Sequence, residues 1–456
     1  MGGIIMLAAY AVLMVLVTIL VTKKPQNPLE FHVSNRKMGT IQSALSIAAT
    51  WVWAPALFVS AERAYLQGAI GLFWFLIPNV FCLILFIPFA KKIREQMPQG
   101  ITLSGFIGER YGKGAKKAYL FQLSALSVLS TGVNLLAGGA VLSVITGMPF
   151  WLLTVILAAI AYSYSQFSGI KASVLTDAVQ MVLILAVCLL FVPVAFQRNG
   201  LHSLVAGIAG PGGEFGNIFS RKGWEVFLSF GLPTAIGLIA GPFGDQNFWQ
   251  RAFTIKQNKI GKAFVLGAIA FGIVPLSMGI LGYIACGSGF IPQNPGVVNL
   301  EIVTSLFPAW STLPFVFMLV SGLLSTVDSN LCAMASLTTD ITKSQNMIIP
   351  RGAMLVNLGL GILIANIPEV TITNLFLFYG TLRASTLAPT VMTLQKRKLH
   401  WVAPGVIVSL AAGLPLFAWG TFANLPLVKL TGSLVTLGAS GIITLIGGQY
   451  GNQKRA

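Results

Sequence analysis

The chain has 456 residues, of which 55% are hydrophobic and only 9% are charged, and its formal net charge is +17. Soluble domains carry about 25% charged residues, and a charge fraction this low cannot cover the surface of a soluble body. The composition therefore excludes a soluble enzyme and a disordered scaffold. The positive charge does not indicate nucleic-acid binding, because Lys and Arg occur in short clusters between long apolar stretches. These features predict a polytopic membrane protein.

The apolar stretches predict an all-α protein whose spans are transmembrane helices. A helix crosses a bilayer with ~20 apolar residues, and counting such stretches gives about thirteen spans. Their approximate ranges are 3–22, 38–62, 69–90, 118–146, 149–166, 170–196, 225–246, 260–287, 312–340, 346–366, 370–394, 400–421 and 430–448. The first span lacks the basic start and the small-residue cleavage site of a signal peptide, so we expect it to be retained. The connections 197–224 and 288–311 are rich in Gly and Pro and are expected to be loops.

The basic residues predict how the chain is oriented in the cell membrane. With an external N-terminus, 23 of the 29 Lys and Arg residues lie in internal segments, including clusters at Lys23, Lys91 and Lys396. Positive residues are retained on the cytoplasmic side of a membrane. We therefore expect a multi-pass protein with its N-terminus outside and its C-terminus in the cytoplasm.

Two of the predicted spans contain residues that interrupt a helix. Span 38–62 contains Pro55 after an Ala-Ala-Thr stretch, and span 225–246 contains Pro233 followed by Gly241-Pro242-Phe243-Gly244. Non-helical backbone at membrane depth is tolerated only where it is buried or lines a cavity. Paired interruptions in two halves are typical of inverted-repeat transporters that bind their substrate at the breaks. The alternative is that these residues only kink helices that pack against each other.

Span 312–340 carries the densest group of polar side chains. Ser321, Ser325, Asp328 and Ser329 recur at helical spacing and share one face, and Thr326 borders it. Hydroxyls in membrane helices often bond to their own backbone or to a neighbouring helix. A carboxylate at this depth, however, indicates a functional site. Clustered oxygens suit a monovalent cation, whose hydration shell they can replace.

Four further charged residues lie in or beside the predicted spans. Asp177 is expected to contact either a capping neighbour or a cation held jointly with span 312–340. Asp245 and Arg251 are interpreted as an interfacial ion pair that anchors the end of span 225–246. Arg383 lies inside span 370–394, where it would extend to the interface, pair with a buried acid or contact a solute.

The sequence contains none of the motifs expected of an ATP-driven or metal-dependent protein. There is no GxxxxGK[ST] phosphate loop, no HExxH and no paired Cys and His set for zinc. The four cysteines lie in or at the ends of apolar stretches, where they are expected to pack as small hydrophobic residues. We therefore do not expect an enzyme.

Four blocks of the sequence resemble the sodium:solute symporter family, which includes carriers of proline, pantothenate, sugars and sialic acid. These blocks are FHVSNRKMG, GIKASVLTDAVQ, DQNFWQRAFTIKQNKIGKAF and SGLLSTVDSNLCAMASLTTDI. The stretches TWVWAPALFVSAERAY, ITLSGFIGERYG and DQNFWQRA look most like the urea active transporter branch. The resemblance implies a leucine-transporter-like fold of thirteen helices. Segment 3–22 would be an extra helix, 38–196 and 225–394 two inverted five-helix repeats, and 400–448 two further helices.

The resemblance also implies where the coupling ion, Na⁺, binds. One sodium site would consist of the carbonyl groups of Ala49, Val52 and Gly322 and the hydroxyl groups of Ser325 and Thr326. Some family members hold a second sodium ion, and the corresponding positions here are Asp177, Ser325, Asp328 and Ser329. Asp177 would alternatively serve the exit path of a single ion or bind a proton.

Aromatic residues are expected to line the solute site. Trp51, Trp53 and Trp74 offer few hydrogen-bond donors, and Trp51 stands where an acid or amide is common in the family. Such walls suit a small, flat, weakly polar solute rather than a sugar, although a Trp can also anchor a helix at the lipid interface. The backbone between Gly237 and Gly241, together with Tyr379, would supply polar contacts.

These features together predict sodium-coupled symport of urea or a similar small solute by alternating access, with the protein acting as a monomer. The alternatives are a proton-coupled carrier that uses Asp177 or Asp328, and an uncoupled facilitator of the same fold. Flux against a solute gradient separates coupled transport from facilitation.

Overall fold

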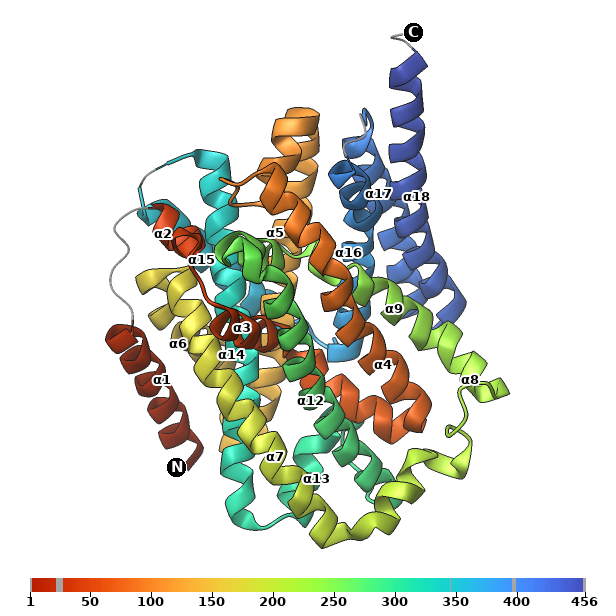
Figure 1. The fold of residues 1–456 in the computed structure, drawn as a ribbon. Coiled ribbons are helices and arrows are strands. Elements are labelled where there is room, and N and C mark those ends of the chain that lie inside the picture. The colour runs from red at the N-terminus through yellow and green to blue at the C-terminus, as the bar shows by residue number, and fades with distance from the viewer. Residues whose placement is uncertain (1, 22–27, 345, 396–398, 454–456) are drawn as a thin grey trace.

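The computed structural model describes residues 2–21, 28–344, 346–395 and 399–453, and over these ranges its regular elements are helices apart from one isolated bridge between Met38 and Ile255. Nine of the described helices are long and apolar enough to cross a membrane. The helices form one bundle, and α1 begins at one end of it while α18 finishes at the other (Figure 1). The expected all-α membrane architecture is confirmed. The basic clusters at Lys23 and Lys396 lie outside the described residues.

The first half of the chain forms seven α-helices: α1 (Gly2–Val21), α2 (Pro28–Val33), α3 (Thr40–Trp51), α4 (Ala54–Gln96), α5 (Leu103–Thr146), α6 (Phe150–Ser168) and α7 (Ile170–Ile208). α4 contains the end of one predicted span and the whole of the next, and the chain bends between them at Gly68, where φ is 51°. Glycine adopts this conformation without strain. A Cβ atom at Gly68 would also lie only 2.5 Å from the carbonyl oxygen of Ile208, so the bend brings α4 against the end of α7.

The second half begins with a series of short helices: α8 (Arg221–Val226), the π-helical segment η3 (Phe227–Gly231), α9 (Leu232–Ile239), α10 (Gly241–Gly244) and α11 (Gln246–Thr254). Long helices follow: α12 (Ile260–Gly287), α14 (Ala309–Thr342), α15 (Ile348–Ala365), α16 (Ile372–Leu394), α17 (Val402–Phe422) and α18 (Pro426–Gln453). The thirteen predicted spans each coincide with one of these helices, with part of one, or with an interrupted pair.

Both connections expected to be loops contain helix. α13 (Val298–Leu306) lies within 288–311, and the carboxylate of Glu301 on α13 accepts hydrogen bonds from the backbone N–H groups of Gln293 and Asn294 at 2.6 and 2.8 Å. The last turns of α7 and the first residues of α8 lie within 197–224. The expectation of loops was therefore wrong in part, because a short helix buried on one face has neither the length nor the uniform hydropathy of a span.

The first predicted interruption lies between α3 and α4. α3 ends at Trp51, and Trp53 has extended backbone with φ −99° and ψ 177°. Pro55 at the start of α4 favours this break, because the ring restricts the preceding residue and removes one N–H donor. The N–H of Ala54 is satisfied by the side-chain oxygen of Asn134 on α5 at 2.9 Å. The break is therefore buried, and the backbone N–H at the start of α4 is partnered.

The second predicted interruption separates α9 from α11. α9 ends at Ile239, the short α10 follows, and Asp245 has extended backbone with φ −102° and ψ 121° before α11 begins at Gln246. The region is fully buried from Gly241 onward. Both interruptions thus occur in the interior of the bundle, where they can line a site.

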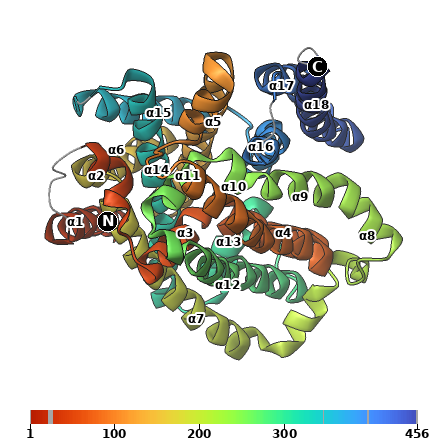
Figure 2. The same cartoon turned by 45° about the horizontal axis from the view of Figure 1, so that its top comes forward.

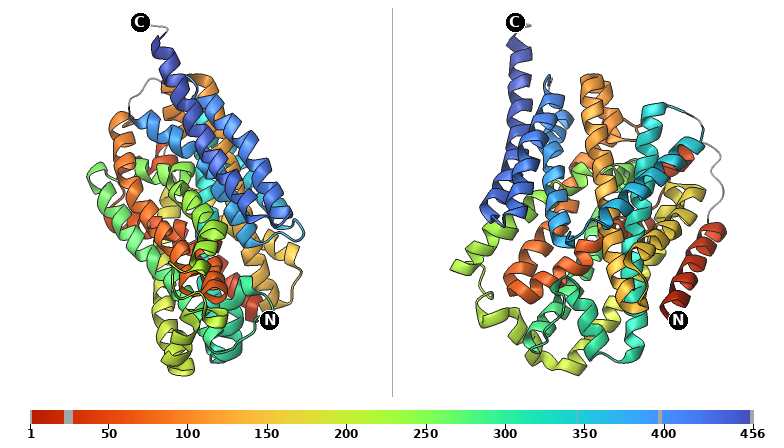
Figure 3. Two further views of the ribbon diagram at one scale, coloured as in Figure 1. Left: turned by 90° about the vertical axis from the view of Figure 1, so that its right-hand side faces the viewer. Right: turned by 180° about the vertical axis from the view of Figure 1, so that it is seen from behind.

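The outermost helices lie on opposite flanks of this core. α1 packs on α6 and α7, whereas α17 and α18 pack on each other and on α16. Figure 2 shows α1 at one side and the α17–α18 pair at the other, and Figure 3 shows the same arrangement from two further directions. The two helix breaks consequently lie between these flanks, and the residues at the breaks are buried.

Candidate functional site

The end of α3 lies directly against α14. A Cβ atom added to Gly322 would be 3.2 Å from the carbonyl oxygen of Val52, and Thr326 Oγ1 donates a hydrogen bond to the carbonyl oxygen of Thr50 at 3.2 Å. The carbonyl oxygen of Ala49 accepts a bond from the N–H of Val52 at 3.1 Å, and a carbonyl oxygen can accept a second partner. The structure therefore places three of the five expected sodium ligands, Val52, Gly322 and Thr326, at the buried contact between α3 and α14, and Ala49 lies at the end of α3.

The fifth expected ligand, Ser325, links this position to Asp177. Ser325 Oγ donates to Asp177 Oδ1 at 2.6 Å, and Ser46 Oγ donates to Asp177 Oδ2 at 2.6 Å. Asp177 is completely buried on α7. These bonds join α3, α7 and α14 through one carboxylate, and they place Asp177 beside the expected sodium site.

The residues expected to hold a second sodium ion also meet, but a guanidinium group lies among them. Arg251 Nη2 is 2.8 Å from Asp177 Oδ2 and 2.8 Å from Ser329 Oγ, while Arg251 Nε donates to Ser46 Oγ at 3.1 Å. Only 1% of the Arg251 side chain is exposed. A fixed positive charge therefore contacts two of the four expected ligands, Asp177 and Ser329.

Asp328 lies deeper in the same polar cluster. It accepts hydrogen bonds from Ser173 at 2.7 Å, from Ser329 at 3.3 Å and from Thr176 at 3.4 Å. It is completely buried, and within the described ranges no basic group lies within 4 Å of its carboxyl group. A carboxyl group so placed at membrane depth is costly to ionise.

The interfacial ion pair between Asp245 and Arg251 is a wrong prediction, because each residue has another partner. Arg251 pairs with Asp177, and Asp245 pairs with Arg383 on α16. The sequence interpretation treated 245–251 as one helical end. Asp245, however, precedes α11 in extended conformation, and its carboxylate pairs with Arg383 on α16. All four charged groups are buried in the bundle rather than at the interface.

The second ion pair is surrounded by aromatic rings. Arg383 Nη2 and Nε both donate to the carboxylate of Asp245, and Tyr379 Oη donates to it at 2.9 Å. The guanidinium carbon of Arg383 lies 4.0 Å from the ring centroid of Tyr379, 4.9 Å from that of Trp51 and 5.1 Å from that of Trp53. Such cation–π contacts stabilise a desolvated cation. Of the three roles considered for Arg383, the structure shows the pairing with a buried acid.

Four of the expected solute-lining residues belong to this aromatic cluster. Trp51 and Trp53 stack with centroids 6.3 Å apart, and Trp53 contacts Tyr379 at 5.0 Å. A Cβ atom at Gly241 would be 2.4 Å from Trp51, so the indole ring lies against the second helix break. The structure therefore joins both interruptions through one aromatic cluster.

The other two expected solute-lining residues lie elsewhere. Trp74 packs on Phe227, with ring centroids 4.8 Å apart, and against Gly231 of η3. Gly237 faces Gly380, and a Cβ atom on Gly237 would be 2.5 Å from the Cα atom of Gly380. The structure assigns these two residues to helix packing and does not bring them into the aromatic cluster.

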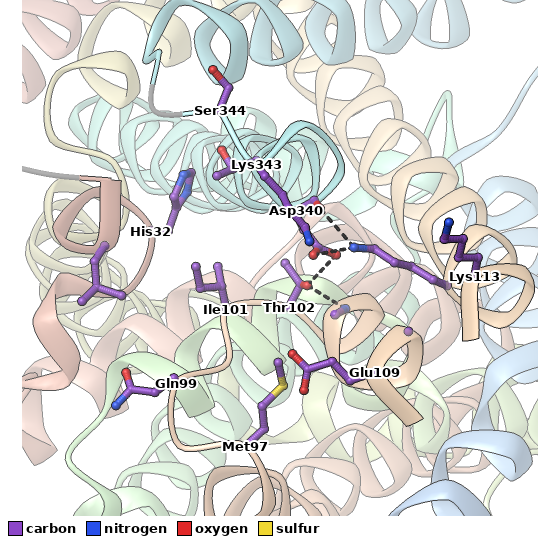
Figure 4. A pocket seen from close by; sticks show the side chains of 15 residues that line it. His32, Met97, Gln99, Ile101, Thr102, Glu109, Lys113, Asp340, Lys343 and Ser344 are labelled. Carbon is purple, nitrogen blue, oxygen red and sulfur yellow. Dashed lines mark hydrogen bonds and ion pairs between the residues drawn. The ribbon is translucent and has the colours of Figure 1, made fainter. Parts of the chain in front are cut away.

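A cavity of about 800 Å³ lies at the end of the bundle where α18 finishes, which is the expected cytoplasmic end. Its walls include the ion pair between Lys116 and Asp340, whose charged atoms are 2.7 Å apart, and Thr102, which donates to Asp340 at 3.1 Å (Figure 4). His32 also faces this cavity, and burial lowers the pKa of its imidazole to about 4. His32 is consequently neutral at physiological pH and does not change its protonation state there.

A second cavity, of about 380 Å³, is lined by residues near the expected external ends of the helices. Thr373 donates to the carboxylate of Glu62 at 2.6 Å across it, and Arg63 pairs with the same carboxylate at 3.3 Å. Neither cavity is lined by the ion pairs at the two helix breaks. Among the described residues, the two buried ion pairs therefore lie apart from both cavities.

Curated relatives of this chain are solute transporters. It is 25% identical to the urea active transporter of Saccharomyces cerevisiae over 94% of this chain and 66% of that protein. It is 23% identical to the urea-proton symporter of Oryza sativa over 86% of this chain and 61% of that protein. It is also 23% identical to the sodium/pantothenate symporter of Escherichia coli over 92% of this chain and 90% of that protein. The chain thus spans about two thirds or less of the urea transporters that it matches.

A solved structure of a Na⁺-coupled sialic acid symporter in a substrate-bound outward-open state superposes with a TM-score of 0.77. The alignment covers 99% of this chain and 98% of that one at 14% identity, and it shows the shared fold. The expected leucine-transporter-like fold is therefore confirmed. The sequence profile of the sodium:solute symporter family matches residues 31–347. This match covers well over half of the chain, which therefore belongs to the sodium:solute symporter family.

Proposed function

We propose that this chain is a secondary active transporter that couples the inward movement of sodium to the uptake of a small polar solute by alternating access. The observation that carries the proposal is the contact between the broken end of α3 at Val52 and the hydroxyl-bearing turn of α14 at Gly322 to Thr326. An ion bound there bridges two elements that must separate when the site opens. In this proposal 38–196 and 225–394 form the two inverted repeats, the N-terminus is external, and one monomer suffices.

The proposed sodium site consists of the carbonyl oxygens of Ala49, Val52 and Gly322 and the hydroxyl oxygens of Ser325 and Thr326. Unwound backbone carbonyls and hydroxyls are suitable ligands for sodium in broken-helix transporters. Sodium binding would fix α3 against α14, and its loss to the cytoplasm would release them. The bond between Thr326 and the backbone of α3 supports this site, because it puts the hydroxyl within reach of the helix end.

We propose further that only one sodium ion is coupled. Two of the positions considered for a second ion, Asp177 and Ser329, contact the guanidinium group of Arg251. A second cation beside this fixed charge would be repelled. Arg251 would thus act as a permanent cation that neutralises Asp177 and holds α7, α11 and α14 together.

A proton-coupled carrier is the second candidate, and Asp328 favours it. This carboxyl group is buried beside three hydroxyl donors and has no basic partner among the described residues. Such a group is suited to bind and release a proton. One relative, from Oryza sativa, carries the name urea-proton symporter.

The proposed solute is urea or another small uncharged molecule. Three observations support this class: the urea transporters among the relatives, the aromatic walls at Trp51, Trp53 and Tyr379, and the internal neutralisation of Asp245 by Arg383. A site whose charges are already paired has no free counter-charge for an ionic solute.

Uptake by purified protein in liposomes tests the proposal. Radiolabelled urea should accumulate above equilibrium when an inward sodium gradient is imposed, and a sodium ionophore should abolish the accumulation. With an inward proton gradient and no sodium, the urea concentration inside the liposomes should rise only to the external concentration. Accumulation driven by protons alone would favour the second candidate, and equilibration under both gradients would identify a facilitator.

A further inference from the structure

The larger of the two cavities, at the expected cytoplasmic end, lies apart from both helix breaks. Its walls come from α2, from the connection 97–102, from the first part of α5 and from the end of α14. Its volume of about 800 Å³ is typical of a small-molecule binding site. No residue of either helix break lines it. The cavity is therefore separate from the proposed sodium and solute positions.

The charged groups that line the cavity leave one positive charge in excess. They are three lysines, Lys113, Lys116 and Lys343, and two acids, Glu109 and Asp340. Asp340 pairs with Lys116 at 2.7 Å. Lys113 and Lys343 are exposed, and among the described residues neither has a carboxylate within 4 Å of its ammonium group. Two lysines are thus available to an anionic ligand.

His32 adds an uncharged polar group to the same wall (Figure 4). Only 1% of this residue is exposed, and neither of its ring nitrogens has a hydrogen-bond partner. A neutral imidazole offers one N–H donor and one acceptor nitrogen. Other buried polar groups of the chain also lack a partner, but His32 lacks one at both nitrogens and borders a cavity that is large enough for a ligand. A ligand that satisfies it needs both an acceptor and a donor.

We propose that this cavity is a regulatory site for a phosphate monoester. The phosphate oxygens would accept hydrogen bonds from Lys113 and Lys343. Near neutral pH a phosphate monoester carries a charge of about −1.5 to −2 and is partly protonated, so it would offer His32 both an acceptor and a donor. Hydroxyl groups on the rest of the ligand would donate to Glu109. A soluble organic phosphate and a phospholipid headgroup can both present this group.

The cavity wall is bonded to the helix that follows the second break. Ile101 and Thr102 line the cavity. Gln246, the first residue of α11, donates to the carbonyl oxygen of Ile101 at 3.0 Å and accepts a hydrogen bond from the N–H of Leu103 at 3.2 Å. A ligand that fixes this wall would therefore hold α11 in its present position. The effect on transport rests on the proposed function: a bound phosphate monoester should slow uptake, because it stabilises one conformation of the cycle.

Binding to unmodified, detergent-purified protein tests the ligand class. The probe is glycerol 3-phosphate, which is compared with glycerol and with sulfate at equal ionic strength, and the readout is the thermal unfolding midpoint. Glycerol 3-phosphate should raise the midpoint in a saturable manner, whereas glycerol and sulfate should not. Equal stabilisation by sulfate would overturn the proposal, because sulfate at neutral pH has no proton to donate.

Phosphatidic acid distinguishes the two sources, since it presents the same phosphate monoester within a membrane. Stabilisation in liposomes that contain phosphatidic acid, relative to phosphatidylcholine alone, without an effect of glycerol 3-phosphate would identify a lipid headgroup as the ligand. Stabilisation by glycerol 3-phosphate without an effect of the lipid would identify a soluble one. The absence of both effects would overturn the proposal.

Substitutions test the residues. Lys113→Gln and Lys343→Gln should each weaken binding of the stabilising phosphate about tenfold, the effect of losing one charge-assisted hydrogen bond. Lys117→Gln is the matched control, because Lys117 is exposed on the same helix as Lys113 but does not line the cavity. An equal loss of affinity in Lys117→Gln would contradict the assignment, since any nearby positive charge would then suffice.

His32→Phe separates binding from a purely structural role. It keeps a ring at this position and removes both unpartnered nitrogens, so the unfolding midpoint without ligand should not fall. Binding of the phosphate should nevertheless weaken. Unchanged affinity in this variant would overturn the place given to His32 in the site.

These binding measurements use no ion gradient, so they do not depend on the transport proposal. In liposomes that accumulate urea, enclosed glycerol 3-phosphate should slow the initial rate of uptake, and the double variant Lys113→Gln/Lys343→Gln should lose this inhibition. Binding that leaves the rate unchanged would overturn the regulatory role. Binding to a protein that shows no gradient-driven uptake would instead overturn the transport proposal and leave the phosphate site standing.

Discussion

Two of the buried arginines are each neutralised by one carboxylate: Arg251 by Asp177 and Arg383 by Asp245. Removing one member of a buried pair leaves an uncompensated charge, which costs about 3–5 kcal/mol. The surroundings of the two pairs differ. Hydroxyl groups and backbone surround Arg251, whereas aromatic rings surround Arg383. The guanidinium group of Arg251 is therefore suited to take the place of a bound ion. The pair of Arg383 and Asp245 is suited to face a solute.

Thr326 provides the sharpest test of the sodium site. Thr326→Ala removes one of the five proposed ligands without changing any charge, and the sodium concentration for half-maximal uptake should rise about tenfold. Thr338→Ala is the control, because Thr338 lies on the same helix and its hydroxyl bonds only to the backbone oxygen of Met334, at 2.9 Å. Equal sodium dependence in the two variants would show that the site is misplaced.

The role of Arg251 as a fixed cation can be tested by charge removal. Arg251→Gln exposes Asp177 as an unpaired carboxylate, which should either lower the midpoint of thermal unfolding or recruit a second sodium ion. We expect sodium to stabilise this variant more than the wild type, with a Hill coefficient for sodium above one. The double variant Arg251→Gln/Asp177→Asn should lose that extra sodium effect and recover part of the stability. An unchanged sodium response in Arg251→Gln would contradict this role.

At the level of elements, the two helix breaks could be predicted, but the partners of the charged residues could not. Pro55 and the Gly241–Gly244 stretch predict the breaks, because proline and glycine alter the local backbone conformation and can be read directly from the sequence. The pairing of Asp245 with Arg383 depends on how α16 packs against the broken segment, and no local pattern records that contact. A base stabilises a buried acid at membrane depth, yet Asp177 and Asp245 could each pair with Arg251 or Arg383, and Asp328 has no basic partner among the described residues.

The contact between α9 and α16 also escaped sequence interpretation, and it gives a prediction at this scale. Gly237→Ala would put a methyl group 2.5 Å from the Cα atom of Gly380, so the two backbones must move apart. Overpacking of this kind destabilises by about 1–3 kcal/mol, and the thermal unfolding midpoint should fall. Gly359→Ala is the control, since no atom lies within 4 Å of its added methyl group; it should be neutral or slightly stabilising. Equal midpoints would show that the contact is not tight.

For the whole molecule, hydropathy predicted the all-helical bundle well because the bilayer imposes length and composition on every span. The sequence could not show that the two breaks share one aromatic cluster, or that cavities of about 800 and 380 Å³ lie on either side of the polar clusters. These features arise from the packing of segments that are distant in the chain. This arrangement supports the proposed alternating access, with Lys116–Asp340 beside one cavity and Glu62–Thr373 beside the other.

The charge moved in each transport cycle tests the whole arrangement. In the proposed cycle, one sodium ion and one neutral solute carry a single net charge, because Arg251 would remain in the protein and Asp177 would stay neutralised. A membrane potential of 100 mV supplies about 2.3 kcal/mol per charge, which alone corresponds to about fiftyfold accumulation of the solute. Parallel recordings of current and radiolabelled uptake in liposomes should therefore give a charge-to-solute ratio of one. A ratio of two would require a second coupled cation and would overturn the role given to Arg251. A ratio of zero would indicate uncoupled passage of the solute through the same fold.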